Sequence, residues 1–433
     1  MLDVLLSLKL TYGPIPRVIE LLGILAFLAL LVTRRWKRWL PIAAGAAGAG
    51  VLVGFLVCWL LSDVIDVFGV SLSPDSRIWF SAAVAAIAVA IARLVWSRGR
   101  KVVAVAVVAS TVLFALVGAI GINVDLGEFP DLRTALGIGS YGDIRLPPVD
   151  PATTAIAPLS SWSPPADLLH RGRVGLVTIP ATTSGFPARS ALIYLPPAAL
   201  VVNAPRLPVL EMMSGQPGGP EQMFTSGSLG TSLDAYARAH HGLAPIVVVP
   251  DQLGAPNRNP MCVDSSLGNS ASYLTVDVPA WIRSHLNVLV DRTDWAVGGF
   301  SQGGTCAIQL GAATPSLFGS ILDIAGEVAP KDGDLQQTID SGFGGSTARY
   351  LAATPRQLMR RNGPYADTLG IFAVGALDSR FGPGTRTIAG YATAAGMEVH
   401  LLISSGTAHD WRTVHFAVDS SLPLLGARWG FGG

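Results

Sequence analysis

The five residues Gly299-Phe300-Ser301-Gln302-Gly303 match the Gly-x-Ser-x-Gly pattern of a nucleophile elbow. The apolar run DWAVGGF precedes the serine, and the helix-like run GGTCAIQLGAA follows it. A strand, a sharp turn and a helix in this order hold a serine in a strained, accessible position, and small flanking residues let the chain segments pass. A bare match arises by chance in a chain with 48 glycines, but this context indicates that Ser301 is a nucleophile.

A serine hydroxyl needs a general base, and the base needs an acid that orients it. In elbow-containing hydrolases these groups follow the serine in the order Asp or Glu, then His. Asp378 follows the apolar run IFAVGA, and His409 follows the run EVHLLIS. Both fall at the carboxyl ends of predicted strands, where open α/β sheets place their sites. We therefore predict a Ser301, Asp378 and His409 triad; the alternatives are a turn-forming aspartate and a surface histidine. Other acids are less well placed: Asp323, Glu327, Asp367 and Asp410.

Acyl transfer also requires fixed N–H donors that stabilise an oxyanion. One donor is normally the residue after the nucleophile, here Gln302, and the other lies in a loop after an early strand. The glycine-rich turn SGQPGGP follows the run VLEMM, so we predict the backbone N–H of Gln216 as the second donor. Pro217 has no N–H and cannot serve. An ordinary Gly/Pro turn is the alternative.

The region 168–433 alternates short apolar runs with amphipathic ones, a pattern that predicts a mostly parallel sheet with crossover helices. The expected strands are Val174–Pro180, Arg189–Leu195, Leu207–Met213, Ile246–Pro250, Trp295–Phe300, Ile321–Ile324, Ile371–Val374 and Val399–Ile403. The expected helices are Leu233–His240, Val276–Leu286, Gly303–Ala313, Thr385–Ala395 and a last one after Trp411. With the elbow, this order of elements predicts the α/β-hydrolase fold.

Residues 1–122 have a different composition from the rest of the chain. Half of the 433 residues are hydrophobic and only 14% are charged, against about 25% in soluble domains. Four apolar runs are long enough to cross a bilayer, which takes about 20 residues each: Val18–Thr33, Leu40–Leu61, Ile78–Trp96 and Val102–Ile122. We predict four transmembrane helices; the alternatives are a helical core in a soluble protein and a cleaved signal peptide.

Charge placement predicts the orientation of these spans. The loop after the first span contains Arg34, Arg35, Lys37 and Arg38, and the loop after the third contains Arg98, Arg100 and Lys101. Short basic loops stay in the cytoplasm, so the N-terminus and everything after the fourth span are expected outside it. The Pro-, Ser- and Thr-rich stretch 123–167 is expected to be a linker without a regular core element.

Three cysteines do not make a disulfide framework, and no Cys-x-x-Cys spacing for a metal is present. On this topology Cys262 and Cys306 lie outside the membrane in regions that border the site, so a disulfide between them is one expectation and two separate thiols the other. Cys58 lies inside a span and is expected to stay reduced. The net charge of +1 gives no electrostatic argument for a nucleic-acid partner.

The stretch from about Arg189 to Val414 resembles the putative-esterase family, which includes the mycolyltransferases of mycolic-acid cell envelopes and esterase-D-like enzymes. The resemblance rests on VLEMMSGQPGG, SYLTVDVPAWIRSHLNV, VGGFSQGG, the aspartate of AVGALDSR and GTAHDW. It implies the same triad, with Gln216 and Gln302 as oxyanion donors by position. Ser214 replaces the family's common histidine, and no cation directly follows Pro217, which argues against a mycolyltransferase-type sugar site.

Together these features predict a membrane-anchored serine esterase that acts outside the cytoplasmic membrane on a lipid or carbohydrate ester, without a cofactor or metal. The alternatives are an acyltransferase that passes the acyl group to a sugar or lipid alcohol, a peptidase on the same fold, and a non-catalytic binding domain. Polar and aromatic loop residues could form an alcohol subsite: Gln222, Asn257, Arg258, Asn259 and Trp411.

Overall fold

The computed structural model describes residues 2–67, 69–98, 100–149 and 159–431. The chain forms two compact units, of which the first comprises Met1–Gly139 together with the short segment Thr407–Trp411. The second unit comprises Ser140–Gly406 and Arg412–Gly433.

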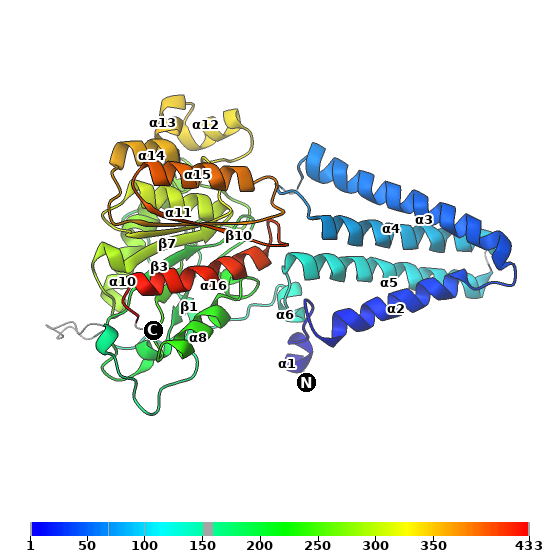
Figure 1. The fold of residues 1–433 in the computed structure, drawn as a ribbon, viewed down its shortest axis with the longest axis horizontal. Helices are drawn as coiled ribbons and strands as arrows, with labels where there is room; N and C mark the ends of the chain where they lie inside the picture. The colour runs from blue at the N-terminus through cyan, green and yellow to red at the C-terminus, as the bar shows by residue number, and fades with distance from the viewer. Residues whose placement is uncertain (1, 68, 99, 150–158, 432–433) are drawn as a thin grey trace. The chain divides into compact units, whose positions relative to one another are not determined.

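Four long helices of the first unit are apolar and long enough to cross a membrane: α2 (Pro14–Leu31), α3 with its π-helical end η1 (Trp36–Val64), α4 (Pro74–Trp96) and α5 (Lys101–Leu126). Two short helices complete this unit: α1 (Leu2–Leu6) and α6 (Leu132–Ala135). Figure 1 shows the four long helices as a bundle. The four predicted spans are thus found as helices; each begins before its apolar run, and α2 ends two residues before the end of its run.

Small residues set the closest approach between α3 and α4. A Cβ atom at Gly50 would lie 2.6 Å from the Cα atom of Ala85, and one at Gly54 would lie 2.6 Å from the Cα atom of Ser81. Larger side chains there would push the two helices apart, which is the packing that small residues allow in lipid. Trp39 is fully buried, and its indole N–H donates to the carbonyl oxygen of Leu30 at 3.1 Å.

The second unit is built on an eight-stranded sheet with the order β1-β2-β4-β3-β7-β8-β9-β10. Its strands are β1 (Arg173–Val177), β2 (Ala191–Leu195), β3 (Val209–Met213), β4 (Ile246–Val249), β7 (Trp295–Phe300), β8 (Ser320–Ile324), β9 (Leu369–Gly375) and β10 (Glu398–Ser404). The pairs β1–β2 and β2–β4 are antiparallel, and all others are parallel. The central strands are buried along their whole length, as expected where helices cover both faces.

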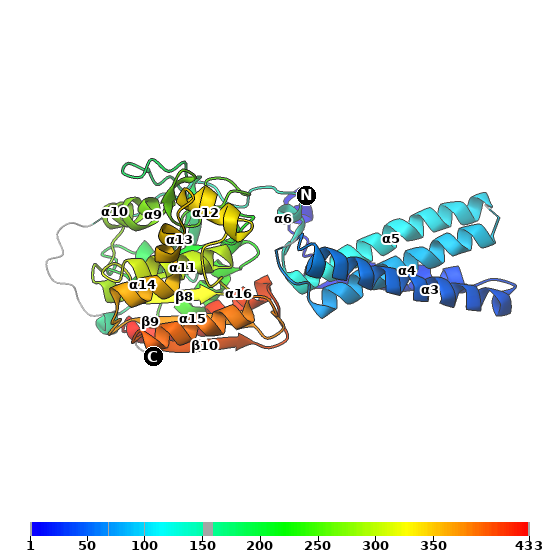
Figure 2. The ribbon, with the colours of Figure 1, turned by 90° about the horizontal axis from the view of Figure 1, so that it is seen from above.

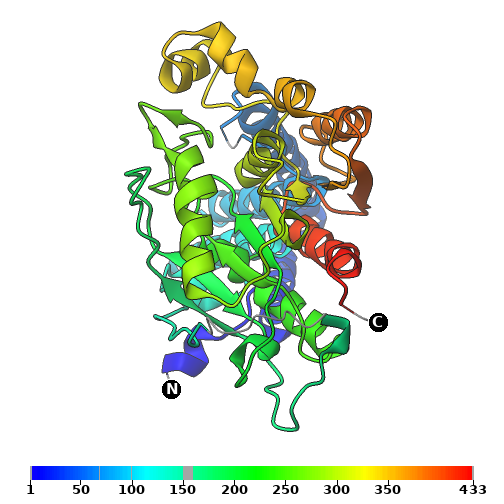
Figure 3. The same cartoon turned by 90° about the vertical axis from the view of Figure 1, so that its left-hand side faces the viewer.

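Helices cover both faces of this sheet, as right-handed crossovers require. One face carries α10 (Val278–His285), α11 (Gln302–Ala313), α14 (Pro355–Asn362) and α15 (Gly382–Ala394), and the other carries α8 (Leu229–Ala239) and α16 (Trp411–Arg428) (Figures 1 and 3). The remaining elements are short: η2 (Leu159–Ser161), η3 (Pro197–Leu200), α7 (Glu221–Phe224), β5 (Asp264–Ser265), β6 (Gly268–Asn269), α9 (Ser270–Ser272), η4 (Tyr273–Asp277), η5 (Arg292–Asp294), α12 (Leu335–Phe343) and α13 (Thr347–Ala353).

All eight predicted strands and five predicted helices correspond to elements of this sheet and its cover. The three helices α12, α13 and α14 between β8 and β9 were not predicted; Figure 2 shows them above the sheet. In the region expected to be a linker, α5 continues to Leu126, α6 follows, and Asp143 forms a bridge with Leu176 of β1. Residues 150–158 of that region lie outside the described residues.

Candidate active site

Ser301 lies on the turn between β7 and α11, with a positive backbone φ of 58° and ψ of −116°. A non-glycine residue at such a φ is strained, and strain at this turn is the mark of a nucleophile elbow. Its N–H donates to the carbonyl oxygen of Ile324 in β8 at 2.8 Å, and its own carbonyl accepts the N–H of Thr305 at 3.0 Å. The elbow is thus fixed from both sides.

The two glycines of the motif are required by close backbone approaches. A Cβ atom at Gly299 would lie 2.2 Å from the carbonyl oxygen of Gly303, and one at Gly303 would lie 2.5 Å from that of Ser214. No side chain fits at these distances. The spacing that the sequence showed is therefore a steric requirement of the turn.

The glycine-rich turn after β3 lies directly beside Ser301. A Cβ atom at Gly215 would lie 3.5 Å from the Cβ atom of Ser301. Gln216 follows in this turn, and its side-chain amide donates to the carbonyl oxygen of Asn257 at 3.3 Å. The structure thus brings the turn that contains Gln216 to the elbow that contains Gln302, as an oxyanion site would require.

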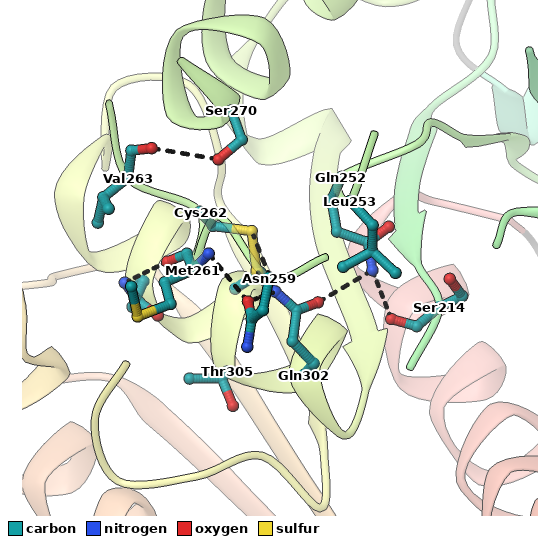
Figure 4. The surroundings of a disulfide bond; sticks show 12 residues. Ser214, Gln252, Leu253, Asn259, Met261, Cys262, Val263, Ser270, Gln302 and Thr305 are labelled. Carbon is teal, nitrogen blue, oxygen red and sulfur yellow. Dashed lines mark hydrogen bonds between the residues drawn. A yellow bond between two sulfur atoms is a disulfide. The ribbon is translucent and has the colours of Figure 1, made fainter. Parts of the chain in front are cut away.

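The side chain of Gln302 is held by a polar network around a disulfide (Figure 4). Its amide nitrogen donates to Asn259 Oδ1 at 3.0 Å and lies 3.2 Å from Cys306 Sγ, and its amide oxygen accepts from Gln252 at 3.0 Å. Cys262 and Cys306 form a disulfide, while Cys58 is a free thiol. The loop after β4 is thereby tied covalently to α11, one turn from Ser301.

An ion pair supports the neighbouring loops from the other side. The guanidinium of Arg189 donates to both carboxylate oxygens of Asp251, at 2.8 and 2.7 Å, and to the carbonyl oxygen of Gly218 at 2.9 Å. Burial alone would raise the pKa of Asp251, but the hydrogen bonds from Arg189 outweigh it and lower that pKa. Asp251 therefore stays ionised and holds Arg189 against the oxyanion turn. Neither role is predicted from the sequence, because nothing local distinguishes Arg189 and Asp251 from surface charges.

Asp378 and His409 follow adjacent parallel strands. Asp378 lies after β9, is buried, and accepts the N–H of Phe381 at 2.9 Å. His409 lies after β10, in the segment Thr407–Trp411 that belongs to the first unit. Both residues therefore follow the carboxyl ends of their strands, which is also the end of β7 at which Ser301 lies.

The buried carboxyl group of Asp323 lies behind the elbow, on β8. Its Oδ1 accepts the N–H of Gly326 at 2.8 Å, and a Cβ atom at Gly304 would lie 2.6 Å from the same oxygen. Complete burial raises the pKa of Asp323 from 3.8 to about 7. In the sequence, Asp323 stands out as an aspartate inside the apolar run SILDI. It was predicted to be a less well placed acid than Asp378, which follows a strand.

A hollow of about 370 Å³ borders this region of the sheet. Its walls come from the loop after β8, the helices α12 and α13, and the segment from the loop after β9 to the start of α15; they include Val328, Tyr350, Arg380 and Phe381. The loop after β8 is joined to the elbow helix, since the N–H of Glu327 donates to Thr305 Oγ1 at 2.8 Å. The hollow is thus lined by segments that follow β8 and β9, and Asp378 lies in the loop after β9.

The residues proposed for an alcohol subsite have different surroundings. Gln222 accepts the N–H of Gly219 at 3.2 Å, and Asn259 is part of the Gln302 network, so both border the oxyanion turn or elbow. Arg258 donates to the carbonyl oxygen of Leu267 at 2.7 Å. Trp411 is buried within the first unit, where its indole N–H donates to Glu128 Oε2 at 2.6 Å.

Comparison with known proteins identifies the family. The family model described as "Putative esterase" matches residues 188–404. An uncharacterized protein of Corynebacterium glutamicum is 33% identical over 314 residues, which cover 70% of each chain. This chain belongs to the putative-esterase family. The predicted resemblance is therefore confirmed.

Solved structures of two esterases share the fold of the second unit. A ferulic acid esterase matches with a TM-score of 0.51 and 15% identity, covering 60% of this chain and 98% of its own. An S-formylglutathione hydrolase from Agrobacterium tumefaciens matches with a TM-score of 0.50 and 21% identity, covering 60% and 97%. The α/β-hydrolase fold that the elbow predicted is confirmed, and family and fold together support a carboxylic ester hydrolase.

Proposed function

We propose that this esterase is a membrane-anchored serine hydrolase that cleaves a lipid or carbohydrate ester outside the cytoplasmic membrane. The observation that carries the proposal is the backbone of Ser301: its φ is 58° at the start of α11, and a Cβ atom at Gly215 would lie 3.5 Å from the Cβ atom of Ser301. Strained serines of this kind persist where the surrounding structure fixes them for chemistry.

In the proposed reaction, Ser301 Oγ attacks the ester carbonyl carbon while His409 takes the hydroxyl proton. The backbone N–H groups of Gln216 and Gln302 stabilise the oxyanion. The tetrahedral intermediate then expels the alcohol, which receives the proton from His409, and an acyl-enzyme remains. Water attacks the acyl-enzyme by the same route in reverse and releases the acid. Asp378 orients the imidazole and stabilises its protonated form.

Two features support the membrane anchor and its orientation. The four apolar helices are long enough to span a bilayer, and the basic clusters lie in the loops after the first and third of them. Short basic loops favour the cytoplasmic side, so the hydrolase unit follows the fourth span to the outer side.

The 370 Å³ hollow supports a substrate with both apolar and polar parts. Val328 and Phe381 offer apolar contacts. Glu327 and Lys331 form an ion pair at 3.7 Å at the same wall, with Arg380 also lining it. A glycolipid or lipid ester provides both kinds of surface.

A fluorophosphonate probe tests this function, because it forms a covalent adduct only with an activated serine. We expect one adduct per chain, on the peptide that contains Ser301, and none after Ser301→Ala or His409→Ala. A wild-type protein that forms no adduct would favour a non-catalytic binding domain.

A second experiment tests whether water or an alcohol accepts the acyl group, with a short-chain ester and increasing concentrations of glycerol or trehalose. Free acid should exceed transfer product at low millimolar alcohol; the reverse would make the protein an acyltransferase.

A further inference from the structure

Two hollows lie side by side within the membrane helices, between α2, α4 and α5. The larger has a volume of about 430 Å³ and is lined by residues that include Ile24, Phe27 and Ala82. The smaller has a volume of about 300 Å³ and is lined by residues that include Tyr12 and Arg17. Both hollows share three lining residues: Glu20, Trp79 and Val117. They therefore adjoin, and we call the two together the α2–α5 hollow.

The hollow exists because the helices approach at glycines and are lined by small side chains elsewhere. A Cβ atom at Gly23 would lie 2.7 Å from Val117 Cγ2, and one at Gly121 would lie 2.2 Å from the Trp79 ring. These contacts fix α2 and α4 against α5. Ala82 and Ala86 on the facing side of α4 are too short to fill the space between them.

The lining changes from apolar to polar along the hollow. Of the described residues that line the larger part, Glu20 alone carries a charge. The smaller part adds Tyr12, Arg17 and Thr11, near the start of α2 at Pro14 and the end of α5 at Leu126. An apolar cavity of this size does not hold ordered water well. Ionisable residues within spans mark ligand sites, and Glu20 and Arg17 lie at this polar end.

We propose that the α2–α5 hollow binds one hydrocarbon chain of the lipid ester on which the hydrolase unit acts. The chain lies between α2 and α4, beside Ile24 and Ala82, and the polar group of the lipid lies beside Tyr12 and Arg17. The hollow occurs in helices that are long and apolar enough to cross a membrane, and both Ile24 and Ala82 are exposed at its border, so a lipid chain could enter sideways from a bilayer. This inference rests on the proposed function, because it names the substrate as a lipid ester.

The polar end of the hollow lies at the end of the helices from which the chain continues to the hydrolase unit. The chain leaves the membrane unit at the end of α5, the same end at which Arg17 and Tyr12 line the hollow. A lipid held with its polar group at that end has its ester on the side of the membrane to which the hydrolase unit is attached. The four helices would then present the substrate as well as anchor the enzyme.

The test uses the full-length protein in lipid nanodiscs with a long-chain ester lipid that carries a diazirine in its acyl chain. Irradiation should label peptides of α2, α4 and α5 that contain Ile24, Ala82 or Val117. Ala82→Phe fills the larger part of the hollow and should reduce labelling at least fivefold. The matched control is Ala115→Phe, because Ala115 is equally exposed on α5 and lines neither part of the hollow. A second filling variant, Leu28→Trp, guards against a folding defect in the first.

Kinetics separate this inference from the proposed function. Both filling variants should lower kcat/KM for a long-chain ester lipid at least fivefold and leave hydrolysis of a short-chain soluble ester unchanged. Labelling that is spread over the outward faces of all four helices, or that neither filling variant reduces, would overturn the hollow as a binding site. Labelling that the variants abolish without any change in long-chain turnover would overturn the bound lipid as the substrate. A wild-type protein without short-chain esterase activity would refute the proposed function, while the labelling still tests the hollow.

Discussion

The side-chain amide of Gln252 donates to two acceptors, Gln302 Oε1 at 3.0 Å and the carbonyl oxygen of Ser214 at 2.6 Å. One buried amide therefore joins the residue after the nucleophile to the first residue of the oxyanion turn (Figure 4). The two proposed oxyanion donors come from segments more than 80 residues apart, and this amide links them within the fold.

Replacing Gln252 tests this link. We expect Gln252→Ala to lower kcat by about 10- to 100-fold with a smaller change in KM, because a buried hydrogen bond of this kind contributes about 1–3 kcal/mol. The exposed Gln336→Ala is the control, since the side chain of Gln336 donates to Asp340 Oδ1 within its own helix, α12. Equal kcat values for both variants would show that the link does not position the donors.

The nucleophile is tested by Ser301→Ala. We expect kcat for a short-chain ester to fall by roughly 10⁴ to 10⁶, because the triad acts as one unit. The exposed Ser316→Ala, beyond the end of α11, should leave kcat unchanged. A Ser301→Ala protein that unfolds cooperatively like the wild type and keeps its esterase activity would refute the serine mechanism.

Asp323 predicts a pH dependence of stability. Its pKa is raised from 3.8 to about 7 by burial, so between these values the folded protein holds a proton that the unfolded chain releases. Stability therefore falls as the pH rises from about 4 to 7, by a few kcal/mol for this group, and levels off above that range. Asp323→Asn cannot titrate, so the difference in melting temperature between the wild type and this variant should change across that interval. A melting-temperature difference that stays constant from pH 4 to pH 8 would contradict the raised pKa of Asp323.

The disulfide between Cys262 and Cys306 predicts sensitivity to reductant. It closes a loop of 44 residues, so its loss should cost about 2–4 kcal/mol of unfolding free energy. We expect dithiothreitol to lower the melting temperature of the hydrolase unit and the esterase rate, and to have no effect on a Cys262→Ser/Cys306→Ser protein. The double variant should already show the lower melting temperature. If neither dithiothreitol nor the double substitution changes the melting temperature, the loop after β4 keeps its position without the disulfide.

The orientation in the membrane is tested by cysteine labelling in intact cells. A cysteine at the exposed position Ser160 should react with an impermeant maleimide, and one at the exposed position Arg98 should not. The physical reason is the basic character of the loop that contains Arg98 and Lys101. Labelling only at Arg98 would place the hydrolase unit in the cytoplasm.

The sequence by itself determined most of the elements and the Gly-x-Ser-x-Gly turn that contains Ser301. Apolar runs of about 20 residues predict membrane helices, and short buried runs between turns predict strands, because both signals are local. The motif around Ser301 is equally local as a sequence pattern, and Gly299 is required by a contact within the turn itself, although Gly303 is required by the approach of Ser214. The three helices between β8 and β9 escaped prediction because they have only 9, 7 and 8 residues, about two turns each, which is too short for a helical period to stand out.

Only the tertiary structure decided which distant residues support the site. Arg189 and Asp251 pair across the sheet edge, and Gln252 joins two turns, because strand order brings their segments together. The raised pKa of Asp323 likewise follows from burial between a sheet and a helix, which no local pattern specifies. Long-range packing sets both hydrogen-bond partners and solvation, so a carboxylate or an amide acquires its role in this protein only when the chain is folded.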